Sequence, residues 1–375
     1  MPTQQTRGYA EPPGHLEIHL DHIRRNYLSL QKMLGQGADC AAVIKADAYG
    51  LGAAEVTPEL YKVNCRHFYA AHLSEGLVVR QALHGQEAQI YVLHGPYGAA
   101  PEEFVRNNLI PVLNTLGDIE YWADFARKAG QRLPAVIHLD TGMNRLGLSA
   151  AEVGRLEKNP DILKPLNIRY VMSHLACADE STHPKNKEQL EKFGQLRRQL
   201  RLPFRLSLAN SAGIFLGTDY HFDQVRPGAA LYGINPQGTL KNPMHGAVTF
   251  KVRILQIRGV DSEETVGYGA TYRVPKSAKL AIISAGYADG CLRSLAGSGR
   301  VHIRGQKCPV VGRISMDLIA ADVTQVAPAP YVGEWAEIIG EHQTVDDIAA
   351  TAKTIGYEIL TGLGRRYKRI YTGQG

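Results

Sequence analysis

The sequence predicts an α/β fold, an N-terminal (β/α)8 TIM barrel followed by a mostly antiparallel C-terminal β domain. From residue 16 to about 235, short apolar runs alternate with longer amphipathic ones. After about residue 245 the helical pattern ends, and closely spaced strand-like runs are broken by glycines and prolines. With 375 residues the chain is long enough for a barrel and an appended domain. We therefore divide it into a polar N-terminal extension (1–15), the barrel (16–244) and the β domain (245–375).

The barrel prediction depends on the number of strand-like runs. Eight apolar, β-branched-rich runs occur over roughly 220 residues, the count and length of a (β/α)8 barrel. A doubly wound open sheet would show the same alternation, so this pattern alone leaves both architectures open. The eight runs are Cys40–Ala46, Phe68–His72, Gln89–His94, Ile110–Asn114, Ala135–Leu139, Arg169–Ser173, Arg205–Leu208 and Gln224–Arg226.

The second domain is predicted from short runs with no helical periodicity, interrupted by one helix-like stretch at Val345–Thr354. Glycine and proline between successive runs indicate tight turns and hence antiparallel pairing. The strand-like runs are Val248–Ile257, Lys279–Ser284, Arg300–Ile303, Cys308–Val311, Leu318–Val323 and Glu334–Ile339.

Composition argues against several classes of protein. A net charge of +6 with scattered basic residues does not indicate a nucleic-acid-binding surface. The five cysteines form no CxxC pair, so neither a metal site nor a disulfide framework is indicated. The polar N-terminus lacks the apolar stretch of a secretory signal, and no apolar run reaches the roughly 18 residues needed to cross a membrane. We therefore expect a cytoplasmic protein that binds no metal, membrane or nucleic acid.

A lysine at the end of the first barrel strand is the most informative residue. In Val43-Ile44-Lys45-Ala46-Asp47-Ala48-Tyr49-Gly50-Leu51-Gly52, Lys45 would point into the mouth of the barrel, where barrel enzymes place their chemistry. A partly desolvated amine near other cations has a lowered pKa and can form a Schiff base. The alanines and glycines leave room for a flat ring, and Tyr49 offers a hydroxyl to a phosphate.

This run resembles the cofactor-lysine signature of the alanine racemase family, and further motifs match that family in the same order. The resemblance covers the chain from about residue 16 to the C-terminus, and the ordered set is far more specific than any single motif. The further motifs are Asp140-Thr-Gly-Met-Asn-Arg145-Leu-Gly, Ser173-His174, Asn210-Ser211-Ala212, Arg226-Pro-Gly228-Ala229-Ala-Leu-Tyr-Gly, Gly267-Tyr268-Gly-Ala-Thr-Tyr, Gly286-Tyr287-Ala-Asp-Gly and Gly312-Arg-Ile-Ser-Met316-Asp317.

The resemblance implies a homodimer whose active sites each use the partner's β domain, with pyridoxal 5'-phosphate as the cofactor. Lys45 would carry the cofactor as a Schiff base, and the phosphate would lie against a glycine-containing turn. The residues assigned to cofactor binding are Lys45, Tyr49, His174, Asn210, Ser211, Arg226, Gly228 and Ala229.

The same resemblance implies racemisation by two bases on opposite faces of the substrate Cα. Lys45 would serve the D-face and Tyr268 of the partner the L-face, with a His174–Arg226 relay tuning the tyrosine. Arg226 would face the ring nitrogen, where a guanidinium that does not lose its proton disfavours a second positive charge. The residues assigned to substrate binding are Arg145, the Met316 amide, Tyr287 and Asp317.

Two positions depart from the family pattern. Where some members carry a carbamylated lysine seven residues before the arginine equivalent to Arg145, this chain has His138, which cannot become that anion. Another group or a bound anion must then orient Arg145. A C-terminal tyrosine that binds phosphate in some relatives corresponds to Arg365, with Tyr367 two residues on, so that role is not transferred.

The function predicted is interconversion of L- and D-alanine, which supplies D-alanine for cell-wall peptidoglycan or catabolises it. A broad-specificity amino-acid racemase and a fold-related decarboxylase of basic amino acids are the alternatives. A cofactor-carrying homeostasis protein built on the barrel alone is a non-enzyme alternative. Arg226 argues against the decarboxylase, which uses an acidic partner for the ring nitrogen, and the β domain argues against the homeostasis protein. The sequence leaves open the substrate range, the metabolic direction, the rates and the strength of dimerisation.

Overall fold

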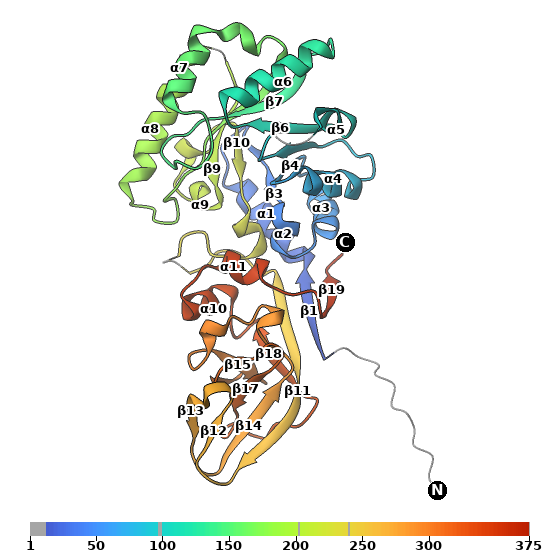
Figure 1. The fold of residues 1–375 in the computed structure, drawn as a ribbon, viewed down its shortest axis with the longest axis vertical. Helices are drawn as coiled ribbons and strands as arrows, with labels where there is room; N and C mark the ends of the chain where they lie inside the picture. Colours follow the sequence, from blue (N-terminus) through green and yellow to red (C-terminus); the bar gives the residue numbers. More distant parts are fainter. Residues whose placement is uncertain (1–12, 97–99, 202, 239–240, 375) are drawn as a thin grey trace. The chain divides into compact units, whose positions relative to one another are not determined.

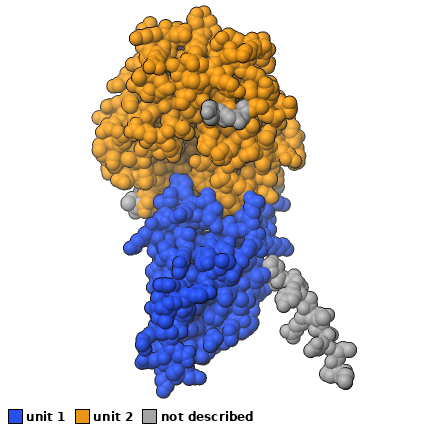
Figure 2. Space-filling view, in the orientation of Figure 1, with its two compact units in different colours: residues 1–20, 246–374 blue, residues 21–245, 375 orange. Residues whose placement is uncertain are grey.

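The computed structural model describes residues 13–96, 100–201, 203–238 and 241–374. The chain divides into two compact units, residues 1–20 with 246–374 and residues 21–245, which Figure 2 colours separately. We call them the β unit and the barrel unit. No described helix is both long and apolar enough to cross a membrane.

The strands of the barrel unit form one parallel sheet that closes on itself. Its order is β2-β10-β9-β8-β7-β6-β5-β4-β3. Since β2 and β3 are consecutive pieces of one strand on either side of Ala41, pairing of β2 with β10 and of β3 with β4 completes the barrel. This confirms the predicted barrel over the open sheet. The strands are β2 (Asp39–Cys40), β3 (Ala42–Val43), β4 (His67–Ala70), β5 (Gln89–Val92), β6 (Leu109–Leu113), β7 (Leu133–His138), β8 (Leu166–Met172), β9 (Leu206–Asn210) and β10 (Gln224–Arg226).

Helices surround these strands (Figure 1), and several begin at residues whose side chains cap them. The Thr115 and Ser149 hydroxyls accept hydrogen bonds from Asp118 and Glu152 amides in the first turns of α6 and α7. Proline opens α5 and α8, where its missing N–H costs nothing. The helices are α1 (Leu20–Lys32), α2 (Lys45–Tyr49), α3 (Ala53–Lys62), α4 (Leu73–Ala82), α5 (Pro101–Arg106), α6 (Leu116–Lys128), α7 (Ala150–Lys158), α8 (Pro184–Gln199) and α9 (Ser211–Ile214), with short 3-10 turns η1 (Pro160–Leu163), η2 (Thr218–Tyr220) and η3 (Ala229–Tyr232).

Buried tyrosines of β4, β5 and β8 contact one another and polar residues at the beginnings of β2 and β10. The Tyr69 and Tyr91 rings stack with centroids 4.5 Å apart. The Tyr69 hydroxyl donates to Gln224 at 2.6 Å, and the Tyr170 hydroxyl donates to Asp39 at 2.8 Å. Barrel enzymes place their chemistry at the carboxyl ends of the strands.

The β unit contains an eight-stranded sheet, in the order β14-β17-β16-β15-β18-β11-β1-β19, and a separate hairpin of β12 and β13. The strands of this unit pair antiparallel, except for β1 with β19, which is parallel. Helix α10 (Val345–Ala352) confirms the predicted helix-like stretch, and α11 (Gly356–Thr361) follows it. The strands are β1 (Gly14–His19), β11 (Val248–Val260), β12 (Glu264–Val266), β13 (Tyr272–Val274), β14 (Ala278–Ile283), β15 (Arg300–Ile303), β16 (Gln306–Val311), β17 (Ile319–Asp322), β18 (Trp335–Ile339) and β19 (Lys368–Thr372).

Strand β1 corrects the predicted start of the barrel at residue 16. Leu16 is paired with Phe250 of β11 and with Arg369 of β19, so residues up to Leu20 belong to the β unit. Its alternating burial is typical of a strand with one covered face. The partners lie hundreds of residues away, and no local pattern could identify them. Most of the predicted N-terminal extension, residues 1–12, lies outside the described residues.

Candidate active site

Lys45 follows β3 after a single residue, Ile44, at the carboxyl end of the first barrel strand. The Ile44 amide donates to the Tyr69 carbonyl at 2.9 Å, which ties the strand end to β4 just before the lysine. Burial, reinforced by the charge of Arg145, lowers the pKa of the Lys45 amine, and Glu75 opposes that shift. The environment therefore favours the neutral, nucleophilic form of the amine.

The turn that contains Lys45 has an unusual backbone. The four residues after the lysine, Ala46 to Tyr49, all have φ between 52° and 57°, in the left-handed region. For residues other than glycine this costs roughly 1–2 kcal/mol each, so surrounding contacts must hold the turn. The Glu75 carboxylate accepts from the Ala46 amide at 2.8 Å and from the Ala71 amide at 2.7 Å.

Glu75 is a site residue that sequence reasoning missed. It occupies the third position of α4, where a carboxylate often caps a helix, and it reaches back to His72 at 3.2 Å. The usual signal is a Ser, Thr, Asp or Asn at the first capping position. Here that residue is His72, so the pattern was hidden.

Tyr49, Ser211 and Gly228 come together as predicted. The Ser211 hydroxyl oxygen accepts from the Gly228 amide at 2.9 Å and from the Ala230 amide at 3.2 Å. A Cβ at position 228 would lie 2.3 Å from the Tyr49 hydroxyl oxygen, so only glycine permits this approach. Ala229 begins η3, which leaves its N–H without a helical partner.

Asn210 stabilises the same turn, because its Oδ1 accepts from the Gly213 amide at 2.9 Å. Hydroxyls and first-turn amides are thus concentrated where strands β9 and β10 end. Such a concentration of donors suits a phosphate.

Arg226 is buried at the end of β10, and its hydrogen-bond acceptors among the described residues are neutral groups. Its guanidinium donates to the Ser207 hydroxyl, to the Ser173 carbonyl at 2.6 Å and to the Leu208 carbonyl at 3.3 Å. Within the described part of the chain no carboxylate contacts it, which excludes the interpretation of a structural arginine paired with an acid. Burial lowers its pKa, although a guanidinium starts so high that it stays charged.

His174 follows β8, next to the carbonyl that binds Arg226. Burial lowers the pKa of its imidazole well below the ordinary value, with Arg226 and Arg145 adding to the effect. Its carbonyl accepts from the Gln189 amide at 2.9 Å, which fixes the backbone. The ring is therefore neutral near pH 7, as a hydrogen-bonding relay requires.

Arg145 lies on the exposed loop between β7 and α7. The Asp140 carboxylate shapes this loop by accepting from the amides of Gly142, Met143 and Asn144 at 2.9, 3.0 and 3.1 Å. The charge of Arg145 depresses the pKa of Lys45, as well as those of His138 and His174. These residues therefore gather at the carboxyl ends of the strands, as the sequence predicted for Lys45, Arg145 and His174.

The remaining predicted residues belong to the β unit. Tyr268 starts a short turn, η4 (Tyr268–Ala270), and Tyr287 starts another, η5 (Tyr287–Asp289). The Tyr287 amide donates to the Ser315 carbonyl at 3.0 Å and the Ala288 amide to the Met316 carbonyl at 3.1 Å. Tyr268, Tyr287 and Met316 are 72%, 45% and 53% exposed, unusually high values for such large side chains.

Asp317 is held by Arg366, which contacts it at 2.6 Å and also pairs with the buried Asp289 at 2.7 Å. The Tyr268 turn packs against Arg313, whose guanidinium would lie 3.0 Å from a Cβ at Gly269. Segments 267–269 and 313–317 are thereby joined. Tyr367, in contrast, donates its hydroxyl to the Ser284 carbonyl inside the β unit and packs its ring on Phe250 at 5.2 Å.

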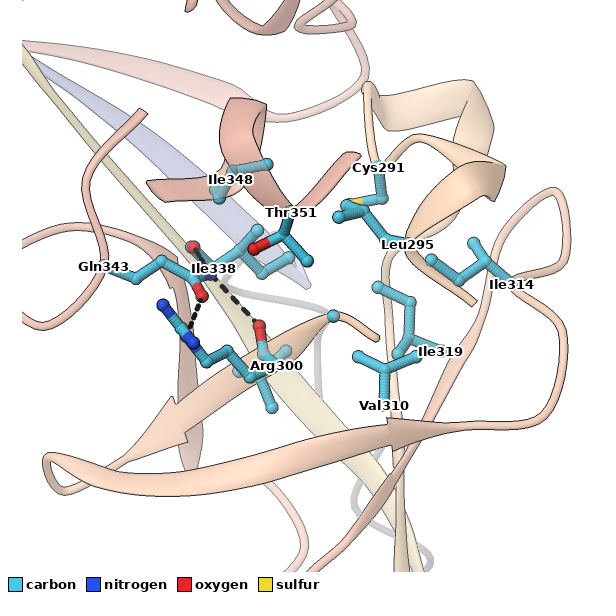
Figure 3. Close-up of a pocket in the computed structure, with 12 residues that line it drawn as sticks. Cys291, Leu295, Arg300, Val310, Ile314, Ile319, Ile338, Gln343, Ile348 and Thr351 are labelled. Atoms are coloured by element: carbon cyan, nitrogen blue, oxygen red, sulfur yellow. Dashed lines mark hydrogen bonds between the residues drawn. The ribbon is translucent and has the colours of Figure 1, made fainter. Parts of the chain in front are cut away.

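A cavity inside the β unit is lined by none of the predicted site residues (Figure 3). Its walls are mainly aliphatic. Its polar members satisfy each other, since Arg300 Nε donates to Gln343 at 2.9 Å and Gln343 donates to the Arg300 carbonyl at 3.1 Å. We regard it as a packing gap.

The chain combines a closed barrel with a β domain. At the carboxyl ends of the barrel strands it carries a lysine of lowered pKa and a turn rich in hydrogen-bond donors. These features define a barrel protein whose site is suited to bind a phosphate-bearing cofactor through a lysine. Family models agree: the alanine racemase N-terminal domain matches residues 18–236, and the alanine racemase C-terminal domain matches residues 247–371. The chain belongs to the alanine racemase family.

Individual relatives match over nearly the whole chain. The alanine racemase of Rickettsia canadensis is 46% identical over 358 residues, 95% of this chain and 98% of the relative. That of Rhodospirillum rubrum is 44% identical, with 96% of each chain covered. The crystal structure of alanine racemase from Bartonella henselae, described with covalently bound pyridoxal phosphate, has 40% identity and a TM-score of 0.93 over 96% of this chain and 99% of that one. The biosynthetic alanine racemase of Pseudomonas aeruginosa has 33% identity and a TM-score of 0.86 over 96% and 99%.

Proposed function

We propose that this protein is an amino-acid isomerase that interconverts L- and D-alanine with pyridoxal 5'-phosphate as its cofactor. The observation that carries the proposal is the position of Lys45, whose amine has a lowered pKa, at the same end of the barrel as the Tyr49–Ser211–Gly228 cluster. The names of the relatives and the cofactor of the Bartonella structure support it.

The residues present fit the cofactor. The Lys45 amine would attach it covalently. The Tyr49 and Ser211 hydroxyls and the Gly228–Ala229 backbone, with Asn210 bracing the turn, would hold its phosphate. When bound, the cofactor withdraws electrons from the substrate Cα and makes its proton acidic.

Arg226 would set the reaction type by donating to the ring nitrogen. It is held by two carbonyls and a hydroxyl, with no described carboxylate to take its proton. A donor that stays charged disfavours protonation of that nitrogen. The ring would then withdraw electrons less strongly, so negative charge at Cα would be short-lived and Cα would regain a proton quickly. This limits side reactions.

Two groups on opposite faces of Cα remove and return the proton most directly. We assign these to Lys45 and to Tyr268 of a second copy of the chain, with His174 in the relay that positions the tyrosine. The exposure of Tyr268 and Met316 supports a homodimer, because large apolar side chains of this kind are commonly covered by a partner.

The substrate carboxylate would bind Arg145 and the Met316 amide. That amide makes no hydrogen bond within the described residues, whereas the neighbouring Met316 carbonyl is already used by Ala288. Tyr287 and Asp317, fixed by backbone contacts and by Arg366, would line the substrate entrance. The cytoplasmic location and a cell-wall or catabolic role for D-alanine stay predictions.

One alternative is a broad-specificity racemase. The neutral partners of Arg226 argue against a decarboxylase, and the presence of the β unit argues against a homeostasis protein built on the barrel alone.

The proposed function can be tested by spectroscopy and by a chemical assay. The purified protein should show a yellow absorbance band that borohydride removes, and should racemise alanine faster than other amino acids in a chirality assay. A colourless protein that binds no cofactor, or one that leaves L-alanine unchanged, would overturn the proposal.

A further inference from the structure

His138, the last residue of β7, is a buried histidine with only one ring nitrogen engaged. Its side chain is 8% exposed, and its Nδ1 lies 2.9 Å from Oδ1 of Asn114 at the end of β6. Its Nε2 makes no hydrogen bond to any described residue. A polar nitrogen left open beside a catalytic cluster needs an explanation.

Asn114 determines which nitrogen of His138 carries the proton. Its amide nitrogen donates to two backbone carbonyls, Leu93 at 2.9 Å and Val112 at 3.1 Å. Since an amide nitrogen has no lone pair to offer, these contacts place Oδ1 toward the histidine. An oxygen that only accepts requires Nδ1–H as the donor, so in a neutral ring Nε2 keeps its lone pair.

The charges around the ring keep it neutral. Burial, with Arg226 from β10 and Arg145 from the following loop, lowers the pKa of His138 to about 3, while Asp140 opposes them. His174, after β8, is also neutral, because its own pKa is depressed. Among the groups near the ring, cations therefore outweigh the single carboxylate. A neutral acceptor is the form of His138 that these cations stabilise.

The open edge of the ring faces the loop that carries Arg145. A Cβ at Gly147 would lie 3.2 Å from Cδ2 of His138, the ring carbon bonded to Nε2. The Leu148 amide donates to the His138 carbonyl at 2.8 Å, and the Asp140 amide donates to the Leu148 carbonyl at 2.9 Å. The loop therefore folds back onto the histidine, with Arg145 two residues before the point of contact.

We propose that His138 is a positioning residue, a neutral imidazole held in the Nδ1–H form by Asn114, whose Nε2 accepts a hydrogen bond from Arg145 and orients that guanidinium toward the substrate carboxylate. The substrate part of this inference rests on the proposed function. An uncharged acceptor leaves the full positive charge of Arg145 available to an anion, which a permanent carboxylate at this position would partly neutralise.

The tautomer can be measured without any activity. In cofactor-loaded protein with 15N-labelled histidine, the His138 signals, assigned by their loss in His138→Gln, should show a protonated Nδ1 and a bare Nε2 from pH 6 to 9. In Asn114→Asp the carboxylate should stabilise the imidazolium and raise the pKa of His138. A protonated Nε2 in the parent protein would overturn the proposal, even if the protein proves not to be a racemase.

The kinetic constants of two variants distinguish a positioning role of His138 from a role in packing alone. His138→Gln keeps an acceptor oxygen, whereas His138→Leu does not. We expect His138→Leu to lower kcat/KM for alanine by on the order of 10- to 100-fold, mostly through KM, and His138→Gln to recover most of it. Equal losses in both variants would indicate packing alone. An equal loss in the parent when chloride is replaced by a bulky anion would assign the role to a bound anion.

Discussion

At the scale of single residues, this site is governed by an excess of positive charge around one amine. Burial and Arg145 depress the pKa of Lys45, and burial together with Arg226 and Arg145 depresses the pKa values of His138 and His174. Each protonated neighbour makes it harder for the next group to hold a proton. The arrangement favours neutral imidazoles and a reactive amine.

Replacing Lys45 tests the central assignment. Lys45→Ala removes covalent attachment and one base together, so racemisation should fall by several orders of magnitude and the yellow band should disappear. Absorbance and a chirality assay on the purified variant measure both. Near-normal racemisation by this variant would disprove the role of Lys45.

Replacing Arg226 tests control of the reaction type. Arg226→Glu should let the ring nitrogen take a proton, prolong the charge at Cα, slow racemisation and increase transamination. The decisive quantity is the ratio of transamination to racemisation in the variant against the parent. Arg226→Lys, which keeps the charge but loses the planar fork, is a less informative companion. An unchanged ratio with cofactor still bound would make Arg226 a structural residue.

The buried His138 also predicts how stability depends on pH. Its folded pKa of about 3 lies below the ordinary 6.5, so as pH falls below 6.5 the unfolded chain takes up a proton that the folded chain does not. Its contribution to stability is complete above pH 6.5 and is lost toward pH 3, at about 1.4 kcal/mol per pH unit.

His138→Gln should therefore make the free energy of unfolding less sensitive to acid, by about 2 kcal/mol between pH 6.5 and pH 5. Urea unfolding at several pH values measures this. His84→Gln, at an exposed position, should leave the slope unchanged. A parallel slope for His138→Gln and the parent would show that the ring is charged in the folded protein.

The sequence predicted many residues of this site but not how they are held. Lys45, Tyr49, Ser211 and Gly228 were found from their motif, and the structure brings the last three together. The importance of Asn114 and Glu75 could not be predicted, because each acts through backbone groups of distant or neighbouring strands. A single side-chain amide or carboxylate in a sequence does not reveal which backbone group it will bind.

At the scale of elements, the short left-handed turn α2 depends on one carboxylate. In Glu75→Gln, an N–H₂ group would replace one of the two oxygens that accept from Ala46 and Ala71. We expect a loss of about 1–3 kcal/mol in unfolding free energy, since at least one amide loses its partner. Removing the negative charge should also lower the pKa of Lys45 further.

Thermal or urea unfolding of the cofactor-loaded variant measures the loss. Glu103→Gln is the matched control, because Glu103 pairs with Arg106 on the surface of α5, where such a pair contributes little. If both variants lose the same small amount, the turn does not need Glu75.

The local sequence pattern predicted some strands better than others. The eight barrel strands were predicted because each is a continuous apolar run between helices, as parallel strands buried on both faces are. Strand β1 was assigned to the wrong unit, because its partners β11 and β19 cannot be seen in its own six residues.

At the scale of the whole molecule, the assignment of bases to two copies of the chain can be tested by mixing. Lys45→Ala and Tyr268→Phe chains, each inactive alone, should form mixed dimers with one intact site out of two. Because half of randomly exchanged dimers are mixed, about a quarter of the parent activity should return. Lys45→Ala mixed with Arg145→Ala is the control: both residues lie in the barrel unit, so no site is restored. Absence of recovery in the first mixture, after verified subunit exchange, would contradict shared sites.

The pairing of β1 with β19 also has a consequence for biosynthesis. His19 and Thr372, joined by a hydrogen bond, are 353 positions apart, and β1 lies between β11 and β19 in the sheet. During translation, at roughly 5–20 residues per second, the first strand therefore waits roughly 20–70 s for its last neighbour. The barrel unit, residues 21–245, closes earlier, when β10 pairs with β2. Strand β1 can pair with β11 soon after the barrel unit has been synthesised, but its other edge, which β19 covers in the folded protein, stays open until the end of translation.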